Sequence, residues 1–456
     1  MNSSFRRKTH VVIVGNTAIG GDNPIRVQSM NTTSTMDTEA SVAQVLRIAQ
    51  AGGELVRLTT QGTREAENMR LISEGVRKAD CQVPLVADVH FNPRVAEVAA
   101  LYCEKVRINP GNYVDAARQF KHLEYTDEEY AAELQKIEAR LLPFLQICRE
   151  HNTAVRIGVN HGSLSDRIMS RYGDTPAGIV ESCMEFLRIC WRERFLNVVI
   201  SIKASNTVVM VQSMRLLVEA MDAEGMTFPL HLGVTEAGEG EDGRIKSAVG
   251  IGALLTEGIG DTIRVSLSEE PECEIPVARA LVEYAQRHRR AEAEASITDG
   301  AICLSYNETD LEQYQLHAAM DCGALLIDKR ATDLKLSNPN FPEQISIDLQ
   351  DSILQAARVK FTRTEYISCP GCGRTLYDLQ GTIRRIKEAT AHLRGLKIAI
   401  MGCIVNGPGE MADADYGYVG AARGKVSLYK NKECVERNIP EDEAVGRLLQ
   451  LIEGDM

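Results

Sequence analysis

Eight short runs rich in β-branched residues alternate with helical patterns between residue 25 and about residue 290. In chain order they read IRVQSM, LVRLT, PLVADVHF, KVRINP, AVRIGV, VVISIKAS, PLHLGVTEAG and TIRVSL. Each is followed by apolar residues at helical spacing, as in DTEASVAQVLRIAQAGG after the first run. Eight such units in roughly 250 residues match the size and strand count of a (β/α)8 TIM barrel. We therefore predict an α/β fold with a TIM barrel over residues 1–290.

The alternative is a doubly wound open sheet. Such a sheet rarely needs eight equal units, and it usually begins with a Gly-x-Gly-x-x-Gly turn. The turn GNTAIGG at residues 15–21 does not follow that spacing, so the barrel is favoured.

The predicted strands carry polar side chains in their C-terminal halves. These are Arg57, Asp88, His90, Arg107, Asn109, Arg156, Asn160, Lys203, Ser205, Thr235, Glu236, Arg264 and Ser266. In a barrel the C-terminal ends of the strands converge on one mouth, where five cations would repel one another unless an anion joined them. A single arginine or lysine is better explained as a solvated strand end or an ion-pair partner. The repetition over five strands favours a phosphate or diphosphate ligand.

One strand-end side chain, Glu236, is a candidate for proton transfer on its position alone. Glu236 ends the seventh run, where a carboxyl near several cations suits a proton donor and an ion-pair partner equally well. His90 and His231 would each also fit as hydrogen-bonded core histidines, and for His231 alone the structural role is favoured.

Two glycine- and proline-rich loops near the C-terminus carry three cysteines. Cys369 and Cys372 lie in SCPGCGRT, and Cys403 lies in MGCIVNGPGE. A Cys-x-x-Cys pair lets two thiolates reach one metal site, and nearby glycines let backbone N–H groups approach sulfur. A lone pair would also suit a thioredoxin-like dithiol or half of a zinc site. The second loop favours a metal or an iron–sulfur cluster.

The fourth ligand decides what such a site does, and the local candidates are Glu410, His392 and Cys434. A Glu410 carboxylate on one iron of a three-cysteine cluster would be exchangeable, which would open a position for substrate. A Cys434 thiolate would close the site for electron transfer or structure. The spacing does not separate these two ligands.

The remaining segments predict an insert and a second domain. Residues 291–350 predict a short insert or linker, in which AICLSY and ALLIDK look like strands around the helical pattern LEQYQLHAAMDCG, and LKLSNPNFPEQ looks like a loop. Residues 351–456 predict a small α/β cluster domain with helices at LQGTIRRIKEATAHLRG and EDEAVGRLLQLIEG. The segment TDEEYAAELQKIEARLLPFLQICREH, within residues 113–151, predicts a surface helix appended to the barrel.

Composition narrows the class of protein. No apolar run approaches the length of a membrane span and no secretory core follows the N-terminus, so a cytoplasmic location is expected. Twelve cysteines in 456 residues indicate reduced thiols rather than a disulfide scaffold. The net charge of −12 argues against nucleic-acid binding.

The motifs taken together resemble a known family. The two cysteine loops, with VQSM, VADVHF, VRINPGN, RIGVNHGS, SIKAS, LGVTEAG and GIGDTIRVSL in the same order, resemble the 4-hydroxy-3-methylbut-2-enyl diphosphate synthases of the non-mevalonate (MEP) isoprenoid pathway. The resemblance covers the barrel and the cluster domain. It implies an iron–sulfur oxidoreductase that uses two electrons to open 2-C-methyl-D-erythritol 2,4-cyclodiphosphate to the linear allylic diphosphate, with flavodoxin or ferredoxin as electron donor.

The resemblance also implies roles for individual residues. A [4Fe-4S] cluster would be held by Cys369, Cys372 and Cys403, with Glu410 on the fourth iron, which selects Glu410 over Cys434. Glu236, His90 and Glu410 are the catalytic candidates. The diphosphate would be bound by Arg57, Arg107, Asn109, Asn112, Arg156, Asn160, Lys203, Arg264 and Ser266.

The insert departs from the family pattern. In the larger branch of the family a second barrel-like domain stands between the catalytic barrel and the cluster domain, whereas this chain has about sixty residues there, fewer than the roughly 200 that a barrel needs. In the compact branch the cluster domain caps the barrel of the partner subunit, so a homodimer is expected. A radical enzyme that uses S-adenosylmethionine would need a Cys-x3-Cys-x2-Cys loop, which the sequence lacks.

Overall fold

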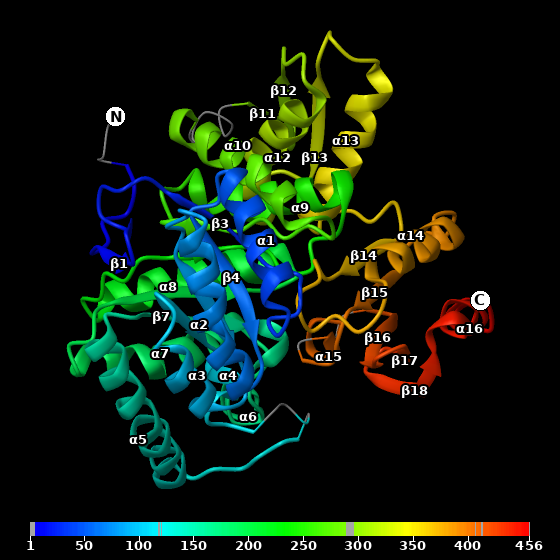
Figure 1. Cartoon of the computed structure of the whole chain (residues 1–456). Coiled ribbons are helices and arrows are strands. Elements are labelled where there is room, and N and C mark those ends of the chain that lie inside the picture. The colour runs from blue at the N-terminus through cyan, green and yellow to red at the C-terminus, as the bar shows by residue number, and fades with distance from the viewer. Residues whose placement is uncertain are drawn as a thin grey trace. The chain divides into compact units, whose positions relative to one another are not determined.

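The chain forms two compact units. The computed structural model describes residues 5–116, 119, 121–288, 296–405, 407–411 and 414–455. The first unit comprises Met1–Lys203, Gln212–Gly233 and Ile259–Arg264, and the second comprises Ala204–Val211, Val234–Gly258 and Val265–Met456. Figure 1 labels the elements of both units along the chain.

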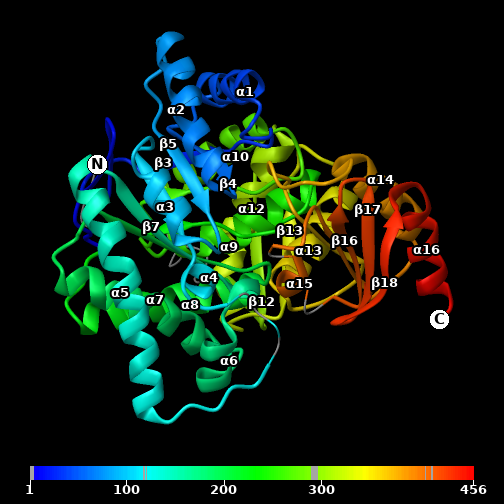
Figure 2. The same ribbon diagram turned by 60° about the horizontal axis from the view of Figure 1, so that its bottom comes forward.

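An eight-stranded parallel sheet forms the centre of the first unit (Figure 2). Its hydrogen-bonded order is β8-β7-β6-β5-β4-β3-β10-β9, and a parallel bridge between Ile200 and Leu230 joins its two ends. The sheet therefore closes into a barrel, and the predicted TIM barrel is confirmed. The strands are β3 (Arg26–Met30), β4 (Leu55–Thr60), β5 (Leu85–Val89), β6 (Lys105–Ile108), β7 (Ala154–Asn160), β8 (Val198–Lys203), β9 (His231–Leu232) and β10 (Thr262–Ile263).

A short hairpin closes one end of the barrel. Strands β1 (Val12–Val14) and β2 (Thr17–Ile19) pair antiparallel. Their side chains join residues near the N-terminal starts of four barrel strands in one apolar cluster, made by Val12, Val14, Ile19, Leu55, Val86, Ala154 and Val199. The polar side chains of the strands are thereby left to the barrel interior and to the C-terminal mouth.

Helices follow the barrel strands, as the alternating pattern predicts. In chain order they are α1 (Thr38–Gln50), α2 (Thr63–Lys78), α3 (Pro93–Ala99), α4 (Pro110–Tyr113), α5 (Asp127–His151), α6 (Asp166–Tyr172), α7 (Pro176–Arg192), α8 (Thr207–Ala223), α9 (Gly240–Leu255) and α10 (Glu274–Arg287), with 3-10 turns η1 (His161–Ser163) and η2 (Pro271–Cys273). Side-chain caps set several starts: Asp37 accepts from the backbone of α1, and Asn92 from that of α3. Among the described residues, no helix is both long and apolar enough to span a bilayer.

Helix α5 corrects one prediction. Its bounds agree with the helical pattern, and Thr126 with Glu129 forms a capping box at its start. It packs against α3 and α7, however, and it connects β6 to β7. It is therefore the fourth helix of the barrel rather than an appended surface helix. The chain between the end of β6 and the start of α5 is longer than most connections from a strand to a helix, and this length led to the prediction of an appended helix.

The insert forms a three-stranded sheet in the second unit. Strand β11 (Ile297–Thr298) pairs antiparallel with β12 (Ala301–Ser305), and β12 pairs parallel with β13 (Asp333–Ser337). Helix α12 (Leu311–Ile327) connects β12 to β13 in a βαβ arrangement, and α13 (Glu343–Ala356) follows. The predicted start of the insert, at residue 291, lies outside the described residues.

One strand assignment and one loop assignment in the insert were wrong. ALLIDK forms the end of α12, and the segment assigned to a loop contains β13. The apolar run is buried because α12 packs closely on α9. A Cβ on Gly323 would lie 2.8 Å from the carbonyl oxygen of Val249, and one on Gly252 would lie 2.6 Å from Met320. Close packing of the two helices thus buries consecutive residues of ALLIDK. A short, continuously apolar segment of this kind has the same sequence pattern as a buried strand.

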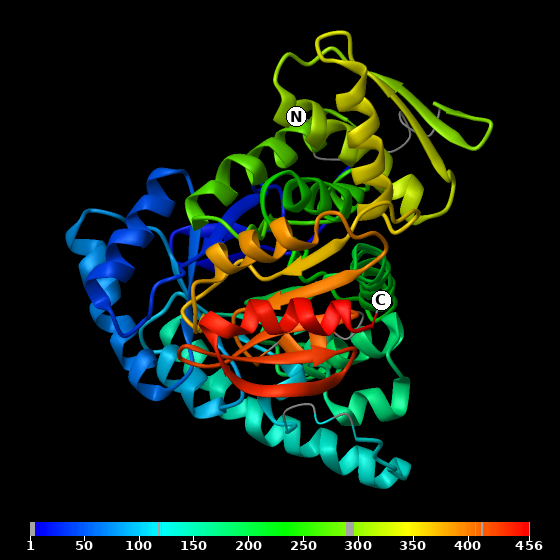
Figure 3. The ribbon, with the colours of Figure 1, turned by 90° about the vertical axis from the view of Figure 1, so that its right-hand side faces the viewer.

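A mixed five-stranded sheet carries the cysteine loops (Figure 3). Its order is β14 (Glu365–Ser368), β15 (Lys397–Met401), β16 (Tyr416–Ala422), β17 (Lys425–Lys430) and β18 (Glu433–Pro440), with the first three strands parallel. Helices α14 (Leu379–Thr390) and α16 (Glu441–Glu453) pack on one face, over Ile398 and Ile400. Ala399 and Met401 alternate to the other face. The short helix α15 (Gly407–Glu410) follows the second cysteine loop.

Candidate functional site

Six basic side chains are buried on or beside the barrel strands of the first unit. They are Arg57 in β4, Lys105 and Arg107 in β6, Arg156 in β7, Lys203 in β8 and Arg264 directly after β10. Sequence analysis named five of them and missed Lys105. Because Lys105 lies two residues before Arg107, it shares the strand face of Arg107, and that spacing was the signal that could have found it.

The positive charges of these buried side chains repel one another, and burial together with this repulsion lowers the pKa values of Arg156 and Lys105. Burial, followed by Arg57 and Arg107, lowers the pKa of Arg156 well below its ordinary value. Burial, followed by Arg156 and Arg57, likewise lowers the pKa of Lys105. The pKa of His231 is lowered by burial and then by several of the same cations. An anion bound among them would be strongly stabilised.

Arg107 is held by the barrel itself. Its Nη1 donates to Asp88 Oδ1 over 3.0 Å and its Nη2 donates to the carbonyl oxygen of Gly158 over 2.8 Å. A Cβ on Gly158 would lie 2.7 Å from Arg107 Nε, so glycine leaves the room that the guanidinium occupies. Arg156 Nη2 lies 3.9 Å from the same Asp88 oxygen. One carboxylate is thus shared by two arginines.

His90 connects Arg107 to the short helix α4. Its Nε2 contacts Arg107 Nη1, and its Nδ1 lies 3.2 Å from Asn112 Nδ2. Asn109 caps α4 through the backbone N–H of residue 111, and its Nδ2 donates to Ser163 Oγ over 2.8 Å. The structure thus connects His90 and Asn112 directly to the basic cluster.

The other basic side chains have partners of different kinds. Arg156 Nη1 lies 3.1 Å from His231 Nδ1. Arg57 donates to the sulfur of Met30 from Nε over 3.1 Å and from Nη2 over 2.9 Å. Arg264 Nη1 lies 3.7 Å from the same sulfur. Sequence analysis did not single out Met30, because methionine at a strand end is most often a core residue.

Lys203 and Asn160 end two neighbouring strands and are paired in their register. A Cβ on Gly233 would lie 2.7 Å from Lys203 Nζ, so the backbone approaches this amine closely. Ser266, the remaining residue predicted for the diphosphate, is buried in the second unit.

The cysteine loops of the second unit follow two adjacent parallel strands. Cys369 comes directly after β14, and its Sγ accepts a hydrogen bond from the backbone N–H of Gly402 over 3.2 Å. Cys372 Sγ accepts from the backbone N–H of Arg374 over 3.4 Å. Cys403 lies two residues after β15. Backbone donors aimed at sulfur stabilise thiolates and are the usual outer contacts of iron–sulfur ligands.

The three thiols lie within electrostatic reach of one another. Burial raises the pKa of Cys369 well above its ordinary value; the backbone N–H of Gly402 offsets part of this effect, and Cys372 adds to it. Burial and then Cys372 raise the pKa of Cys403 to about 11. Three mutually repelling thiolates would be stable together only with a bound cation.

The three cysteines offer thiolate sulfur, the donor that iron–sulfur clusters take from a protein. Among the described residues, no group of three or more His, Cys, Asp or Glu side chains is arranged to hold one metal ion. In a cubane cluster each iron takes its own protein ligand, so the ligands surround the cluster instead of meeting at one point.

Glu410 is buried and is separate from Cys434. Its Oε2 accepts hydrogen bonds from the backbone N–H of Ser205 and from Thr235 Oγ1, each over 3.3 Å. Cys434 lies in β18, where its thiol donates to the carbonyl oxygen of Glu436 over 3.6 Å. His392, the third ligand candidate, is exposed after α14.

Glu236 lies in the same unit with a strained backbone. Its φ of 49° is in the left-handed region, which a non-glycine residue adopts only when its surroundings hold it there. Its side chain is buried, and its charge acts on both Cys403 and Lys246. A carboxyl held in this way has the burial and the neighbours of a functional group.

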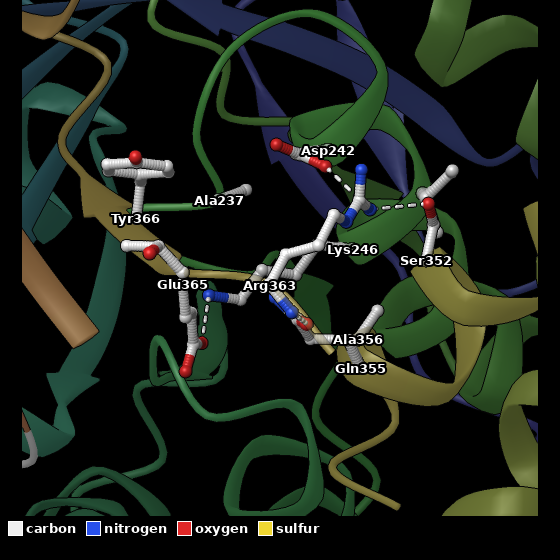
Figure 4. Close-up of a pocket in the computed structure, with 11 residues that line it drawn as sticks. Ala237, Asp242, Lys246, Ser352, Gln355, Ala356, Arg363, Glu365 and Tyr366 are labelled. Carbon is white, nitrogen blue, oxygen red and sulfur yellow. Dashed lines mark hydrogen bonds and ion pairs between the residues drawn. The ribbon is translucent and has the colours of Figure 1, made fainter. Parts of the chain in front are cut away.

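A small pocket of about 40 Å³ adjoins this region inside the second unit (Figure 4). Lys246 Nζ lies 3.4 Å from Glu365 Oε1, and Arg358 Nη1 lies 3.1 Å from Glu365 Oε2. Arg363 donates to Ser352 Oγ over 2.7 Å on the other side of the pocket. This ion-pair network was not predicted, because Lys246 lies 119 residues away from Glu365 in the sequence.

Comparison with known proteins identifies two family matches. The family model described as the GcpE TIM-barrel domain matches residues 9–279, and the one described as the GcpE protein C-terminal domain matches residues 365–454. The intervening residues 280–364 contain the three-stranded insert.

Curated relatives match over nearly the whole chain, and each bears the name 4-hydroxy-3-methylbut-2-en-1-yl diphosphate synthase (flavodoxin). The protein from Bacteroides thetaiotaomicron is 51% identical, over 99% of this chain and 98% of its own length. The protein from Phocaeicola vulgatus is 50% identical, over 99% of this chain and 98% of its own length. The protein from Porphyromonas gingivalis is 45% identical, over 98% of this chain and 97% of its own length. The first alignment has 601 positions against 456 residues here, so at least 145 of its positions have no residue in this chain.

Proposed function

The chain belongs to the GcpE family, and on that premise we infer that it opens 2-C-methyl-D-erythritol 2,4-cyclodiphosphate reductively to (E)-4-hydroxy-3-methylbut-2-enyl diphosphate. It is an oxidoreductase of the MEP isoprenoid pathway. The overall change consumes two electrons and two protons. It breaks one of the two ring C–O bonds and one C–OH bond, and it releases the hydroxyl oxygen as water, while the other ring C–O bond keeps the diphosphate on the product.

The observation that carries this proposal is the set of six buried basic side chains in the barrel. Guanidinium groups bind phosphate oxygens bidentately, and burial strengthens such contacts. We assign Arg57, Arg107, Arg156, Lys203 and Arg264 to the diphosphate. Asn109, Asn112, Asn160 and Ser266 complete the assignment as neutral donors.

We assign a [4Fe-4S] cluster to Cys369, Cys372 and Cys403, with Glu410 as the fourth, exchangeable ligand. When bound, such a cluster supplies single electrons and an iron that can accept an oxygen ligand. The backbone N–H groups of Gly402 and Arg374 support the first two thiolates. Glu410 keeps alternative donors in Ser205 and Thr235, which would stabilise its carboxylate whenever it is away from iron.

We propose Glu236 and His90 as the groups that handle protons. Glu236 is supported by its burial, its strained backbone and its proximity to Cys403. His90 is supported by its contacts with Arg107 and Asn112. A Glu236→Gln variant should lower kcat by roughly 10²- to 10⁴-fold with an unchanged iron content. Normal turnover in that variant would refute the assignment.

The proposal includes flavodoxin as electron donor, a homodimer and a cytoplasmic location. The names of the curated relatives support flavodoxin over ferredoxin. All twelve cysteines lie among the described residues and are free thiols, which suits a reducing compartment. We further propose domains at residues 1–290 and 351–456, with the positions absent relative to the longer relatives falling in the insert, residues 291–350.

The decisive experiment is anaerobic reconstitution with iron and sulfide. We expect about four irons per chain and an EPR signal of the reduced protein that changes when the cyclodiphosphate is added. Tight zinc binding, or a cluster whose signal ignores the cyclodiphosphate, would contradict the proposed activity.

A further inference from the structure

The sulfur of Met30 is a shared acceptor for two arginines of the basic cluster. Met30 ends β3, whose neighbours in the barrel are β4 and β10. Arg57 approaches the sulfur from β4 and Arg264 from the end of β10. Three guanidinium nitrogens therefore point at one sulfur, at 2.9, 3.1 and 3.7 Å. Met30 is 3% exposed, so these contacts are shielded from solvent.

The edge of Arg57 that faces Met30 is chemically informative. Its Nε and Nη2 both donate to the sulfur, and this edge is the one with which arginine grips two oxygens of a phosphate or carboxylate. A thioether is neutral and only a weak acceptor, although it is large and polarisable. Met30 can therefore orient the two guanidiniums without neutralising them.

We propose that Met30 is a positioning residue: its sulfur accepts from Arg57 and Arg264 in the ligand-free protein and gives both guanidiniums up to a phosphate group of the substrate, with which it competes only weakly. This inference rests on the proposed function, since it assumes that the basic cluster binds a diphosphate. A glutamine at this position would offer a carbonyl oxygen, a stronger acceptor that competes with phosphate. A leucine would fill a similar volume and offer no acceptor at all.

The two substitutions should therefore shift binding in opposite directions. Met30→Gln should weaken the binding of inorganic pyrophosphate to the reconstituted enzyme about tenfold, and should raise KM for the cyclodiphosphate similarly with kcat within about twofold. Met30→Leu should tighten pyrophosphate binding by up to about fivefold, because the arginines lose a competing acceptor. Isothermal titration and steady-state kinetics measure both effects.

Controls separate positioning from packing. Met69 is a fully buried methionine of α2, and Met69→Leu reports what the same exchange does to thermal stability elsewhere in the unit. If both Met30 variants weaken pyrophosphate binding to the same extent, Met30 acts through packing alone and the inference is wrong. If Met30→Gln does not fold, Met30→Leu decides by itself: tighter pyrophosphate binding supports the inference, and unchanged or weaker binding refutes it.

A further variant distinguishes failure of this inference from failure of the proposed function. Arg57→Gln should abolish most pyrophosphate binding whether or not Met30 positions the guanidinium. If the wild-type protein and Arg57→Gln bind pyrophosphate equally poorly, the diphosphate site itself is refuted. If Arg57→Gln loses binding while both Met30 variants match the wild type, only the role of Met30 is refuted.

Discussion

The carboxylate of Glu410 accepts a hydrogen bond from the backbone N–H of Ser205 over 3.3 Å. Thr235 Oγ1 donates to the same oxygen over an equal distance, and Ser205 Oγ lies 3.4 Å from the carbonyl oxygen of Glu410. These contacts are long for hydrogen bonds, and each contributes only modest stability. A carboxylate held in this way can leave its donors for a metal ion at a small cost in free energy.

The first prediction separates Glu410 from its rival ligand. Glu410→Ala should retain the three cysteine ligands and most of the iron, but lower turnover at least 100-fold and alter the EPR spectrum of the reduced cluster. Cys434→Ser should change neither, since Cys434 contacts its own strand. Iron analysis and EPR on both variants test which residue is the fourth ligand. Loss of the cluster in Cys434→Ser but not in Glu410→Ala would assign that ligand to Cys434 instead.

The second prediction concerns the carboxylate among the buried cations. Asp88→Asn should destabilise the ligand-free first unit by about 3–5 kcal/mol, because Arg107 and Arg156 lose a shared buried charge partner. Pyrophosphate should then raise the unfolding temperature more in the variant than in the wild type. Trp191, the single tryptophan, lies in α7 of this unit and reports its unfolding by fluorescence. The exposed Asp222, changed to Asn, is the matched control.

The third prediction tests the close approach of backbone to Lys203. In Gly233→Ala the new Cβ would lie 2.7 Å from Lys203 Nζ and 2.9 Å from the carbonyl oxygen of Arg264, so both must move. We expect pyrophosphate affinity to fall about tenfold. Gly446→Ala, where a Cβ meets nothing within 4 Å, should bind as the wild type does. Equal affinity in the two variants would show that Lys203 does not contact the anion.

The fourth prediction is a pH dependence in the second unit. Burial would raise the pKa of Glu365, but Lys246, Arg358 and Lys397 outweigh it, and the pKa lies below its ordinary value of 4.5. A depressed acid pKa stabilises the fold above the unfolded value, and this contribution is lost as the pH falls through the folded pKa. Glu365→Gln should therefore lower the free energy of unfolding by about 3 kcal/mol at pH 7, and by progressively less below about pH 4.5.

Thermal unfolding followed by circular dichroism at several pH values measures this difference. Burial lowers the pKa of Lys246, so loss of its proton would relieve part of the cost in the variant. Glu443→Gln is the control, since Glu443 is exposed and pairs with Arg447 on the surface of α16. If the loss of stability in Glu365→Gln does not change with pH, the charge of Glu365 contributes nothing to the stability of the fold.

Local sequence patterns were sufficient to predict most of the fold. Eight apolar runs with helices between them specify a barrel, because parallel strands buried on both faces leave a clear mark in the sequence. The cysteine loops were equally clear, since glycines and prolines set their turns. The pattern failed at ALLIDK, where Leu325 and Leu326 are buried by helix packing against α9 rather than in a sheet.

Sequence alone therefore determined the barrel and the order of its strands, and it supplied the candidate site residues, because each depends on neighbours along the chain. Tertiary structure decided which of these residues share a partner. Asp88 is common to Arg107 and Arg156, and the sulfur of Met30 to Arg57 and Arg264. Those contacts join separate strands, and the energy of a buried charge depends on every group that closure of the barrel brings beside it.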